Sequence, residues 1–429
     1  VSKIEVYTPK FDGHTELYKR IKSKKITRIK STPGQNFDAI NKAKKTKIGE
    51  FYLNHLKKIN FFKLLTEWSW KTLYPIYVNN TIANRDKHEK RWRSIIKLND
   101  YINLIKIIPI IIFESRSVET PDPLVHPEIF QYDLTSPHEI YDFPSIYIST
   151  INNAEISGGT NLIVKEDFVI SHDLFEAESD YTSEELHGRN IIEPKKNQIR
   201  CLLNDKTPER ISECAVFVDA CAPNYAHWLS EVLPRIAIFC NEEKFKNIPI
   251  VVNDGLHKNI MQSLQIIAGR EREIITLPIG RTLRIDKLHV TSVAGYVPFE
   301  RRDKENHSHS HGKFSSSALQ LMKLEILGQI KNLPNQNYPE KIYIRRNSGI
   351  RQLTNSKEIE EFLVNKNYVI IEPEKLDFIQ QVRLFSNAKR IIATSGAAVA
   401  NIIFSSEETK ITVLIGQYAE TSYWYWQNM

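Results

Sequence analysis

The chain has 429 residues, of which 41% are apolar, so it is long enough to form two or three domains with buried cores. Its longest apolar stretch, Tyr101 to Phe113, contains a lysine and is shorter than the roughly 20 residues that a membrane-spanning helix needs. No membrane-spanning helix is therefore expected. The net charge of +7 is unevenly distributed, because residues 1–115 contain 24 Lys and Arg against 10 Asp and Glu, a net of +14, and the remainder carries −7.

Residues 1–115 are therefore predicted to form a basic, mainly helical N-terminal region. Apolar residues between Glu50 and Tyr74 recur at spacings of three to five, which indicates an amphipathic helix whose apolar face suits either a protein core or a membrane surface. The positive charge could bind an anionic membrane or an acidic polymer. Nucleic acid is not expected as a partner, because no reader motif accompanies the charge.

Two α/β segments follow a proline-rich passage that begins near residue 120. Short strands are expected between Ser145 and Ile170. The first alternating segment has strands at 215–219, 248–252 and 273–277 and helices at 224–240 and 256–268. The second has strands at 341–345, 368–371, 390–394 and 411–415 and helices at 356–365, 376–386 and 397–404. This alternation predicts two parallel sheets, divided into regions 116–310 and 311–429, with a polar linker at 300–317.

The second segment contains a candidate phosphate site, although the chain has neither a P-loop nor a GxGxxG motif. A buried strand ends at Thr394, and Ser395, Gly396 and Ala397 lead directly into a helix that includes Asn401. Unpaired N–H groups and the helix dipole favour an anion at such a helix start. The arginines that follow the neighbouring strand could bind a diphosphate, namely Arg345, Arg346 and Arg351. The alternative is an arginine cluster that pairs with Glu358 or Glu360.

The helix from Asn224 carries the candidate catalytic groups. His227, Glu231 and Arg235 are spaced four apart, so they are predicted to lie on one helix face. Glu231 or His227 could act as a base toward an acceptor hydroxyl, and Asp219 at a strand end is a third candidate. The alternative is a structural Glu231–Arg235 pair with His227 hydrogen-bonded between domains.

These motifs resemble glycosyltransferase family 61. The resemblance rests on Asn224-Tyr-Ala-His-Trp with Leu-Pro-Arg235, on Tyr343-Ile-Arg-Arg346, and on 373–385 followed by 388–404, in this order. It implies a GT-B fold of two Rossmann-like halves, inverting transfer from a nucleotide sugar, no required metal, and a role in bacterial capsule or lipopolysaccharide synthesis. Many members have His-Gly-Ala where this chain has Ser395-Gly-Ala397, so the serine hydroxyl and the backbone would replace that histidine.

On this interpretation the nucleotide sugar binds residues 311–429, and the nucleoside is expected at the loop from Glu372 to Lys375, supported by Gln381 on the next helix. The glycan or glycolipid acceptor would contact residues 116–310, where Asn224, Tyr225 and Arg235 lie on the acceptor side. No cofactor is expected, and His307, His309 and His311 do not have the spacing of a zinc site. Four cysteines without a CxxC pair favour a reducing cytoplasm, with the basic region at the inner face of the membrane.

Two other functions are compatible with the sequence. One is a nucleotide-sugar epimerase, which can have the same two-domain fold. The other is a non-catalytic glycan-binding or scaffold module of a larger polysaccharide synthase, which is suggested by Ser395 in place of histidine and by a first residue, Val1, that is not methionine.

Overall fold

The computed structural model describes residues 6–7, 25–30, 65, 91–120, 123–128, 140–186, 189–201, 208–301, 312–332, 337–347, 353–415 and 429. Apart from Leu65, the helix predicted at Glu50–Tyr74 lies outside the described residues, as do the histidines at 307–311.

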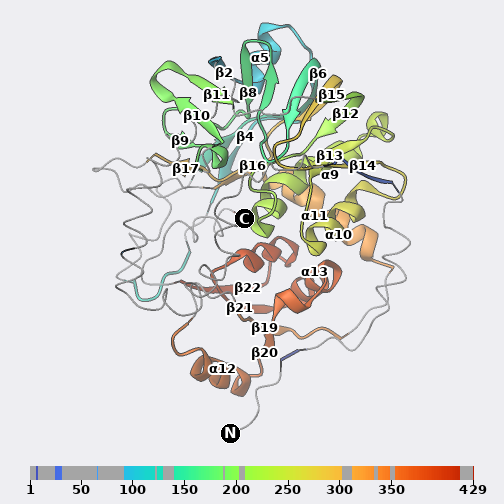
Figure 1. Cartoon of the computed structure of the whole chain (residues 1–429). Helices are drawn as coiled ribbons and strands as arrows, with labels where there is room; N and C mark the ends of the chain where they lie inside the picture. Colours follow the sequence, from blue (N-terminus) through green and yellow to red (C-terminus); the bar gives the residue numbers. More distant parts are fainter. Residues whose placement is uncertain are drawn as a thin grey trace.

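The described chain is a mixed α/β protein built around a twelve-stranded sheet (Figure 1). Across this sheet the strands are β1 (Ile26–Arg28), β14 (Ile274–Leu277), β13 (Ile250–Asn253), β12 (Glu209–Val216), β15 (Thr282–Thr291), β6 (Ile146–Ser157), β7 (Ile163–Lys165), β8 (Phe168–Ser171), β2 (Arg93–Lys97), β11 (Gln198–Cys201) and β10 (Asn190–Glu193), with β3 (Ile110–Phe113) beside β6. The part from β1 to β15 is parallel, and β15 to β8 is antiparallel.

The parallel part reverses its strand order at β12. Strands β13 and β14 lie on one side of β12, whereas β15, which follows them in the sequence, pairs with its other side. Open α/β sheets bind ligands at the carboxyl ends of the strands where the order reverses. Asp219, three residues after β12, lies at this edge.

Strands from residues 1–115 belong to the same sheet. β1 pairs with β14, β2 pairs with β8, and β3 pairs with β6. The expected boundary at residue 116 is therefore crossed by hydrogen bonds within one sheet. The intervening helix α5 (Leu98–Leu104) contacts β2 and β8.

The second sheet has four parallel strands in the order β20 (Val369–Ile371), β19 (Lys341–Ile344), β21 (Arg390–Thr394) and β22 (Lys410–Leu414). Its order reverses between β19 and β21. Arg345 and Arg346 follow β19, and Ser395 and Gly396 follow β21, so the candidate phosphate residues share the edge at which a ligand is expected.

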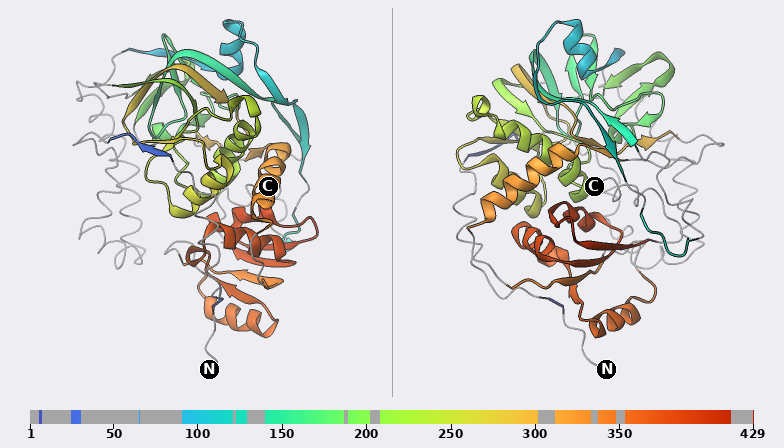
Figure 2. Two further views of the ribbon diagram at one scale, coloured as in Figure 1. Left: turned by 90° about the vertical axis from the view of Figure 1, so that its right-hand side faces the viewer. Right: turned by 180° about the vertical axis from the view of Figure 1, so that it is seen from behind.

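Helices lie between and beside the two sheets (Figures 1 and 2). Those between them are α9 (Leu233–Asn241), α10 (Lys258–Ala268) and α11 (Ser316–Ile330), which face α13 (Phe378–Asn387) and the 3₁₀ helix η7 (Ala397–Phe404) of the second half. Helix α12 (Ser356–Asn365) lies at the far end (Figure 1). Three small two-stranded sheets pair β4 (Arg116–Glu119) with β5 (Ile140–Phe143), β9 (Asp180–Tyr181) with β17 (Phe299–Glu300), and β16 (Gly295–Tyr296) with β18 (Lys313–Phe314). Other short helices are α7 (Ser183–Leu186), η3 (Pro194–Lys196), η5 (Glu243–Phe245) and η6 (Pro373–Lys375).

Most of helix α11 (Ser316–Ile330) lies in a part of the chain, between Ser317 and Lys341, for which the sequence predicts no element. Leu319, Met322, Ile326 and Ile330 are buried on this helix at spacings of three and four. This pattern is present in the sequence, and it extends the chain as a helix directly after the polar segment at 300–317.

One apolar core extends through both halves. Its buried members include Trp228, Phe239 and Leu264 of the first half, and Phe378 and Phe404 of the second. The rings of Phe378 and Phe404 meet edge to face with their centroids 5.8 Å apart. Buried polar bonds accompany this contact, because Asn259 donates to the carbonyl of Leu376 at 2.9 Å and the N–H of Phe378 donates to Gln262 at 2.7 Å.

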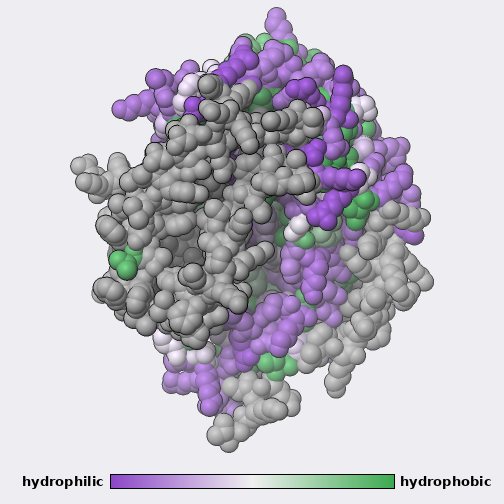
Figure 3. All heavy atoms as spheres, in the orientation of Figure 1, coloured by the Kyte–Doolittle hydropathy of each residue, from purple (hydrophilic) through white to green (hydrophobic). Residues whose placement is uncertain are grey.

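The described surface is mainly hydrophilic on the face seen in Figure 3, with hydrophobic residues in small separate groups. Within the described residues, no helix combines the length and the hydropathy that a membrane crossing requires.

Because the halves share a core, we expect them to unfold in one transition. Phe378→Ala should lower the free energy of unfolding by about 3–5 kcal/mol, since it removes a buried ring from the contact between them. Phe362→Ala is the matched control, because Phe362 is 59% exposed on α12. Urea titration followed by circular dichroism and by tryptophan fluorescence measures both variants, and two separated transitions in the wild type would contradict a shared core.

Candidate active site

The candidate catalytic helix begins at Asn224, whose side chain accepts a hydrogen bond from the N–H of Ala226 at 3.0 Å. It continues as α8 (Tyr225–His227), widens into a π turn, η4 (Trp228–Val232), and resumes as α9. Pro234 has no N–H, so it cannot donate to the carbonyl of Ser230. That carbonyl packs against Gly295, so closely that a Cβ atom on Gly295 would be only 2.3 Å from the oxygen. π turns occur frequently at functional sites.

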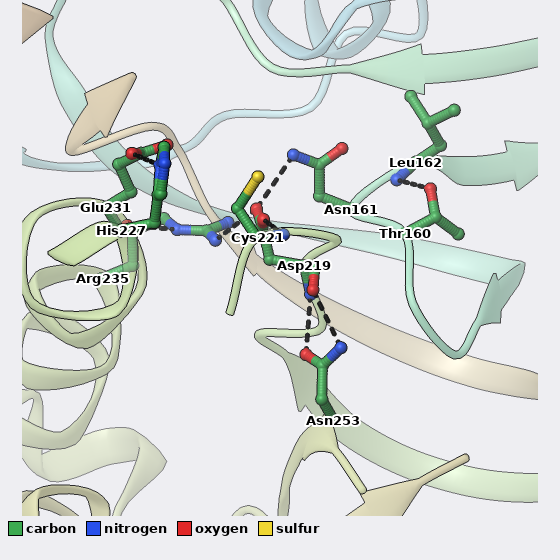
Figure 4. A network of polar contacts seen from close by, with 9 residues as sticks. All are labelled: Thr160, Asn161, Leu162, Asp219, Cys221, His227, Glu231, Arg235 and Asn253. Atoms are coloured by element: carbon green, nitrogen blue, oxygen red, sulfur yellow. Dashed lines mark hydrogen bonds and ion pairs between the residues drawn. The ribbon is translucent and has the colours of Figure 1, made fainter. Parts of the chain in front are cut away.

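His227 and Glu231 form the closest polar pair on this helix, with 2.5 Å between Nδ1 and Oε1 (Figure 4). Glu231 is 8% exposed, and the ring of His227 is stacked near that of Phe299. Burial would lower the pKa of His227, but the charge and hydrogen bond of Glu231, together with Asp219, raise it above its ordinary value. Burial also raises the pKa of Glu231, against the opposing effect of His227. The pair therefore holds protons more tightly than either side chain would in water.

Arg235 does not form the predicted alternative pair with the Glu231 carboxylate. Its Nε donates to the backbone carbonyl of Glu231 at 3.0 Å, and its Nη2 lies 3.5 Å from Oδ2 of Asp219. Glu231 is four residues from both His227 and Arg235, so the spacing allows either pair, and the structure pairs its carboxylate with His227.

Asp219 is fixed by several protein groups (Figure 4). Its Oδ2 accepts from Asn161 at 3.0 Å, and its Oδ1 accepts from the N–H of Cys221 at 2.8 Å. Its backbone N–H and carbonyl both bond to the side chain of Asn253. These contacts hold the Asp219 carboxyl group in place beside Arg235, whereas the raised pKa values of His227 and Glu231 suit that pair to exchange a proton.

A small pocket of about 40 Å³ lies beside Glu231 and Asp219. Other lining residues were not singled out in the sequence, among them Asn161, His172, Glu184, Cys221, Tyr296 and Phe299. Thr182-Ser-Glu-Glu185 has the sequence of a capping box and so signals the start of α7, but it does not reveal which carboxylate lines the pocket.

The second polar site lies where β19 and β21 end. Arg346 donates from Nη1 to the carbonyl of Ser395 at 2.5 Å. A Cβ atom on Gly396 would lie 2.1 Å from the same nitrogen, so the guanidinium contacts the glycine directly and leaves no room for a side chain. Ala397 then begins η7, and the first N–H groups of a helix have no partner within it. The guanidinium of Arg346 therefore lies at the N-terminus of η7.

Arg345 lies in a different environment from Arg346. It donates from Nε to Glu360 at 2.7 Å, makes a second shorter contact with the same carboxylate, and donates from Nη1 to Glu372 at 2.9 Å. The pKa of Glu372 lies below its ordinary value, chiefly because Lys375 bonds to it and also because of Arg345. The predicted alternative, in which the arginines pair with Glu360, is thus correct for Arg345. Arg351 lies outside the described residues.

Two further residues assigned to the donor are bonded within the protein. Asn401 donates to Gln381 at 2.9 Å and accepts from the Tyr225 hydroxyl at 2.8 Å. Gln381 also donates to the carbonyls of Pro373 and Leu376. Tyr225, Asn401 and Gln381 therefore connect the first half to the second through a chain of hydrogen bonds.

No group of three or more His, Cys, Asp or Glu side chains that could hold a metal occurs among the residues described above. Residues 225–412 match a family model described as Glycosyltransferase 61. This match covers the helix that carries His227 and Glu231 and nearly all of the second sheet. A search of the curated proteins finds no match.

The close pair makes a testable prediction about protonation. In Glu231→Gln the charge that raises the pKa of His227 is lost and burial remains, so we expect His227 to titrate below 6.5 in the variant and above it in the wild type. A histidine with a raised pKa stabilises the fold below pH 6.5, and this contribution is lost as the pH rises through the folded-state pKa. NMR titration of the histidine ring protons measures the shift, with the other histidines as internal controls, and an unchanged His227 titration would refute the coupling.

Proposed function

We propose, from the match of residues 225–412 to the Glycosyltransferase 61 model, that the protein transfers a sugar from a nucleotide sugar to a hydroxyl of a glycan or glycolipid, with inversion at the anomeric carbon. We further propose a GT-B type of arrangement, in which residues 116–310 bind the acceptor, residues 311–429 bind the donor, and residues 1–115 form an additional basic region. The parallel part of the first sheet and the parallel second sheet, each with a reversal of strand order, support this assignment.

The observation that carries the proposal is the buried His227–Glu231 pair at the edge of the first sheet. When Nδ1 donates to the Glu231 carboxylate, Nε2 is the ring nitrogen that accepts a proton. The acceptor O–H would give its proton to Nε2 while its oxygen bonds to the anomeric carbon. The bond between that carbon and the diphosphate oxygen breaks, and the nucleoside diphosphate leaves with the electron pair.

Arg346 and the start of η7 would stabilise the departing diphosphate. Arg346 brings a permanent positive charge to the Ser395 carbonyl, next to the helix N-terminus, and donors fixed where charge develops are usually the largest catalytic contribution. Because a guanidinium and a helix dipole can supply this charge, we propose that the reaction requires no metal ion. Arg345 would keep Glu360 and Glu372 in place and act indirectly.

We also propose a location at the cytoplasmic face of a bacterial membrane, in capsule or lipopolysaccharide synthesis. The net charge of +14 on residues 1–115 supports attraction to anionic lipid.

If His227 is the base, His227→Gln should lower kcat/KM by about 10² to 10⁴ while donor affinity stays within a few fold. Glu231→Gln should shift the acidic limb of the pH profile of kcat/KM to lower pH, because the pKa of His227 falls when its anionic partner is removed. A coupled assay of nucleoside diphosphate release, run in EDTA with a panel of nucleotide sugars and acceptors, measures both effects.

Asp219→Asn is the control for this assignment: Asp219 contacts Arg235, Asn161 and Cys221 and makes the smallest of the contributions that raise the pKa of His227, so its pH profile should move to lower pH less than that of Glu231→Gln. A limb that moves only in Asp219→Asn would transfer the base to that residue. Turnover of the nucleotide sugar without any acceptor would favour an epimerase, and donor binding without turnover would favour a scaffold.

The diphosphate site makes a separate prediction. Arg346→Ala should weaken nucleoside diphosphate binding by about 1.5–3 kcal/mol, the usual range for a hydrogen bond to a charged group. Gly396→Ala should have a similar effect, because its methyl group would displace the guanidinium from the helix start. Isothermal titration calorimetry measures both variants.

Arg390→Ala provides the matched control, because it removes the same charge from the exposed opposite end of β21. Unchanged affinity in both Arg346→Ala and Gly396→Ala would show that the diphosphate binds elsewhere. Arg345→Ala is expected to lower the melting temperature, because Glu360 and Glu372 lose their partner.

A further inference from the structure

The hydroxyl of Tyr225 connects the two polar sites of the molecule. Tyr225 lies two residues before His227 on the short helix α8, and its hydroxyl donates to Oδ1 of Asn401 at 2.8 Å. Asn401 is fully buried in η7, the helix that begins directly after Gly396. One hydrogen bond therefore joins the helix of the proposed base to the helix at which the diphosphate is proposed to bind.

The side chains behind this bond have no spare donor. Nδ2 of Asn401 donates to Oε1 of Gln381 at 2.9 Å and to the carbonyl of Ala398 at 3.0 Å. Nε2 of Gln381 donates to the carbonyls of Pro373 and Leu376 at 3.0 and 3.3 Å. These contacts use both amide protons of each side chain. Because a buried network is stable when every member is bonded, the oxygen of Asn401 is held toward Tyr225.

The other end of the connection is anchored in the first half. Asn224 caps α8, and the fully buried Trp228 donates from Nε1 to the hydroxyl of Ser263 on α10 at 2.8 Å. His227 lies between Tyr225 and Trp228 in the sequence. A rotation of this helix would break the bond of Tyr225 or that of Trp228, so the direction of the His227 side chain depends on both.

Apolar packing between the halves does not have this directional effect. The rings of Phe378 and Phe404 contribute to the shared core, but apolar contacts stabilise by the area that they bury and not by their direction. A hydrogen bond weakens steeply when its length or angle changes. The Tyr225–Asn401 bond therefore fixes α8 relative to η7 more precisely than the apolar contacts do.

We propose that Tyr225 is a positioning residue of the transfer reaction, and that its bond to Asn401 sets the separation between the base and the departing diphosphate. The inference rests on the proposed function, because it takes His227 as the base and the start of η7 as the diphosphate site. Tyr225 acts through the two helices that it joins. This role differs from the acceptor contact that the sequence predicts for Tyr225.

The variant Tyr225→Phe tests the proposal, because it removes the hydroxyl and keeps the ring. Each half still binds its own substrate, so KM for donor and acceptor should stay within a few fold. The value of kcat should fall about 10- to 100-fold, since a small misplacement of reacting groups has an effect of this size. The acidic limb of the pH profile should stay in place, because Glu231, the main group that raises the pKa of His227, is unchanged. The nucleoside diphosphate release assay measures these values on the full chain.

Tyr147→Phe is the matched control. Tyr147, on β6, is 3% exposed, and its hydroxyl donates to Asp173 at 2.8 Å, so this variant also removes a bonded hydroxyl from a buried tyrosine. It should lower the melting temperature and keep the wild-type kcat. Unchanged kcat in Tyr225→Phe, an equal loss in Tyr147→Phe, a loss that appears only in KM, or a shifted acidic limb overturns the proposal.

A double-mutant cycle tests whether Tyr225 acts through Asn401. In an Asn401→Leu background, Tyr225→Phe should lower kcat no further, because the bond is already absent. A second loss of the same size as in the wild type would contradict the proposal. If Asn401→Leu does not fold, the comparison of Tyr225→Phe with Tyr147→Phe still decides.

Hydrogen exchange measured by mass spectrometry separates the connection from the transfer reaction. Peptides that cover α8 and η7 should both exchange faster in Tyr225→Phe and keep the wild-type rate in Tyr147→Phe. If they do so and no pair of donor and acceptor reacts, the connection stands and the proposed reaction fails. If transfer occurs and the exchange of η7 is the same in Tyr225→Phe as in the wild type, the reaction stands and the positioning role fails.

Discussion

The packing of α13 and η7 against α8, η4, α10 and α11 is the constraint on which the rest of the structure depends. It joins the twelve-stranded mixed sheet and the four-stranded parallel sheet through one apolar core and through hydrogen bonds at Asn259, Gln262 and Asn401. Tyr225 and His227 lie on the same short helix, and the partner of Tyr225 lies on the helix that starts at Gly396. The contact that stabilises the fold thus also fixes the two polar sites relative to each other.

Charge is divided between two kinds of polar group in this molecule. Asp219 with Arg235, and Arg345 with Glu360 and Glu372, form ion pairs that hold neighbouring segments in place. The His227–Glu231 pair is buried with raised pKa values, which is the condition expected of groups that exchange protons. Similar side chains therefore have different roles, because their partners differ.

Much of the fold could be predicted from local sequence patterns. The bounds of α12, β21 and η7 coincide with the predicted segments, since buried strands and amphipathic helices have strong periodicities. The partners of individual side chains could not be predicted. Glu231 is four residues from both His227 and Arg235, and its pairing with His227 could not be chosen from the spacing. Arg345 and Arg346 are neighbours of the same residue type, yet Arg345 pairs with Glu360 and Glu372 and Arg346 with the carbonyl of Ser395, because these partners come from distant parts of the sequence.

The central antiparallel pair of the large sheet has a consequence for how the chain folds during synthesis. β6 and β15 pair Ser157 with Thr282 and Ile148 with Thr291, so at least 125 residues separate the partners. At translation rates of about 5–20 residues per second, β6 waits roughly 6–25 seconds before β15 has been made. During this time the apolar side chains of β6, which the finished sheet buries, are open to chaperones and to other nascent chains, and the yield of native protein depends on this interval.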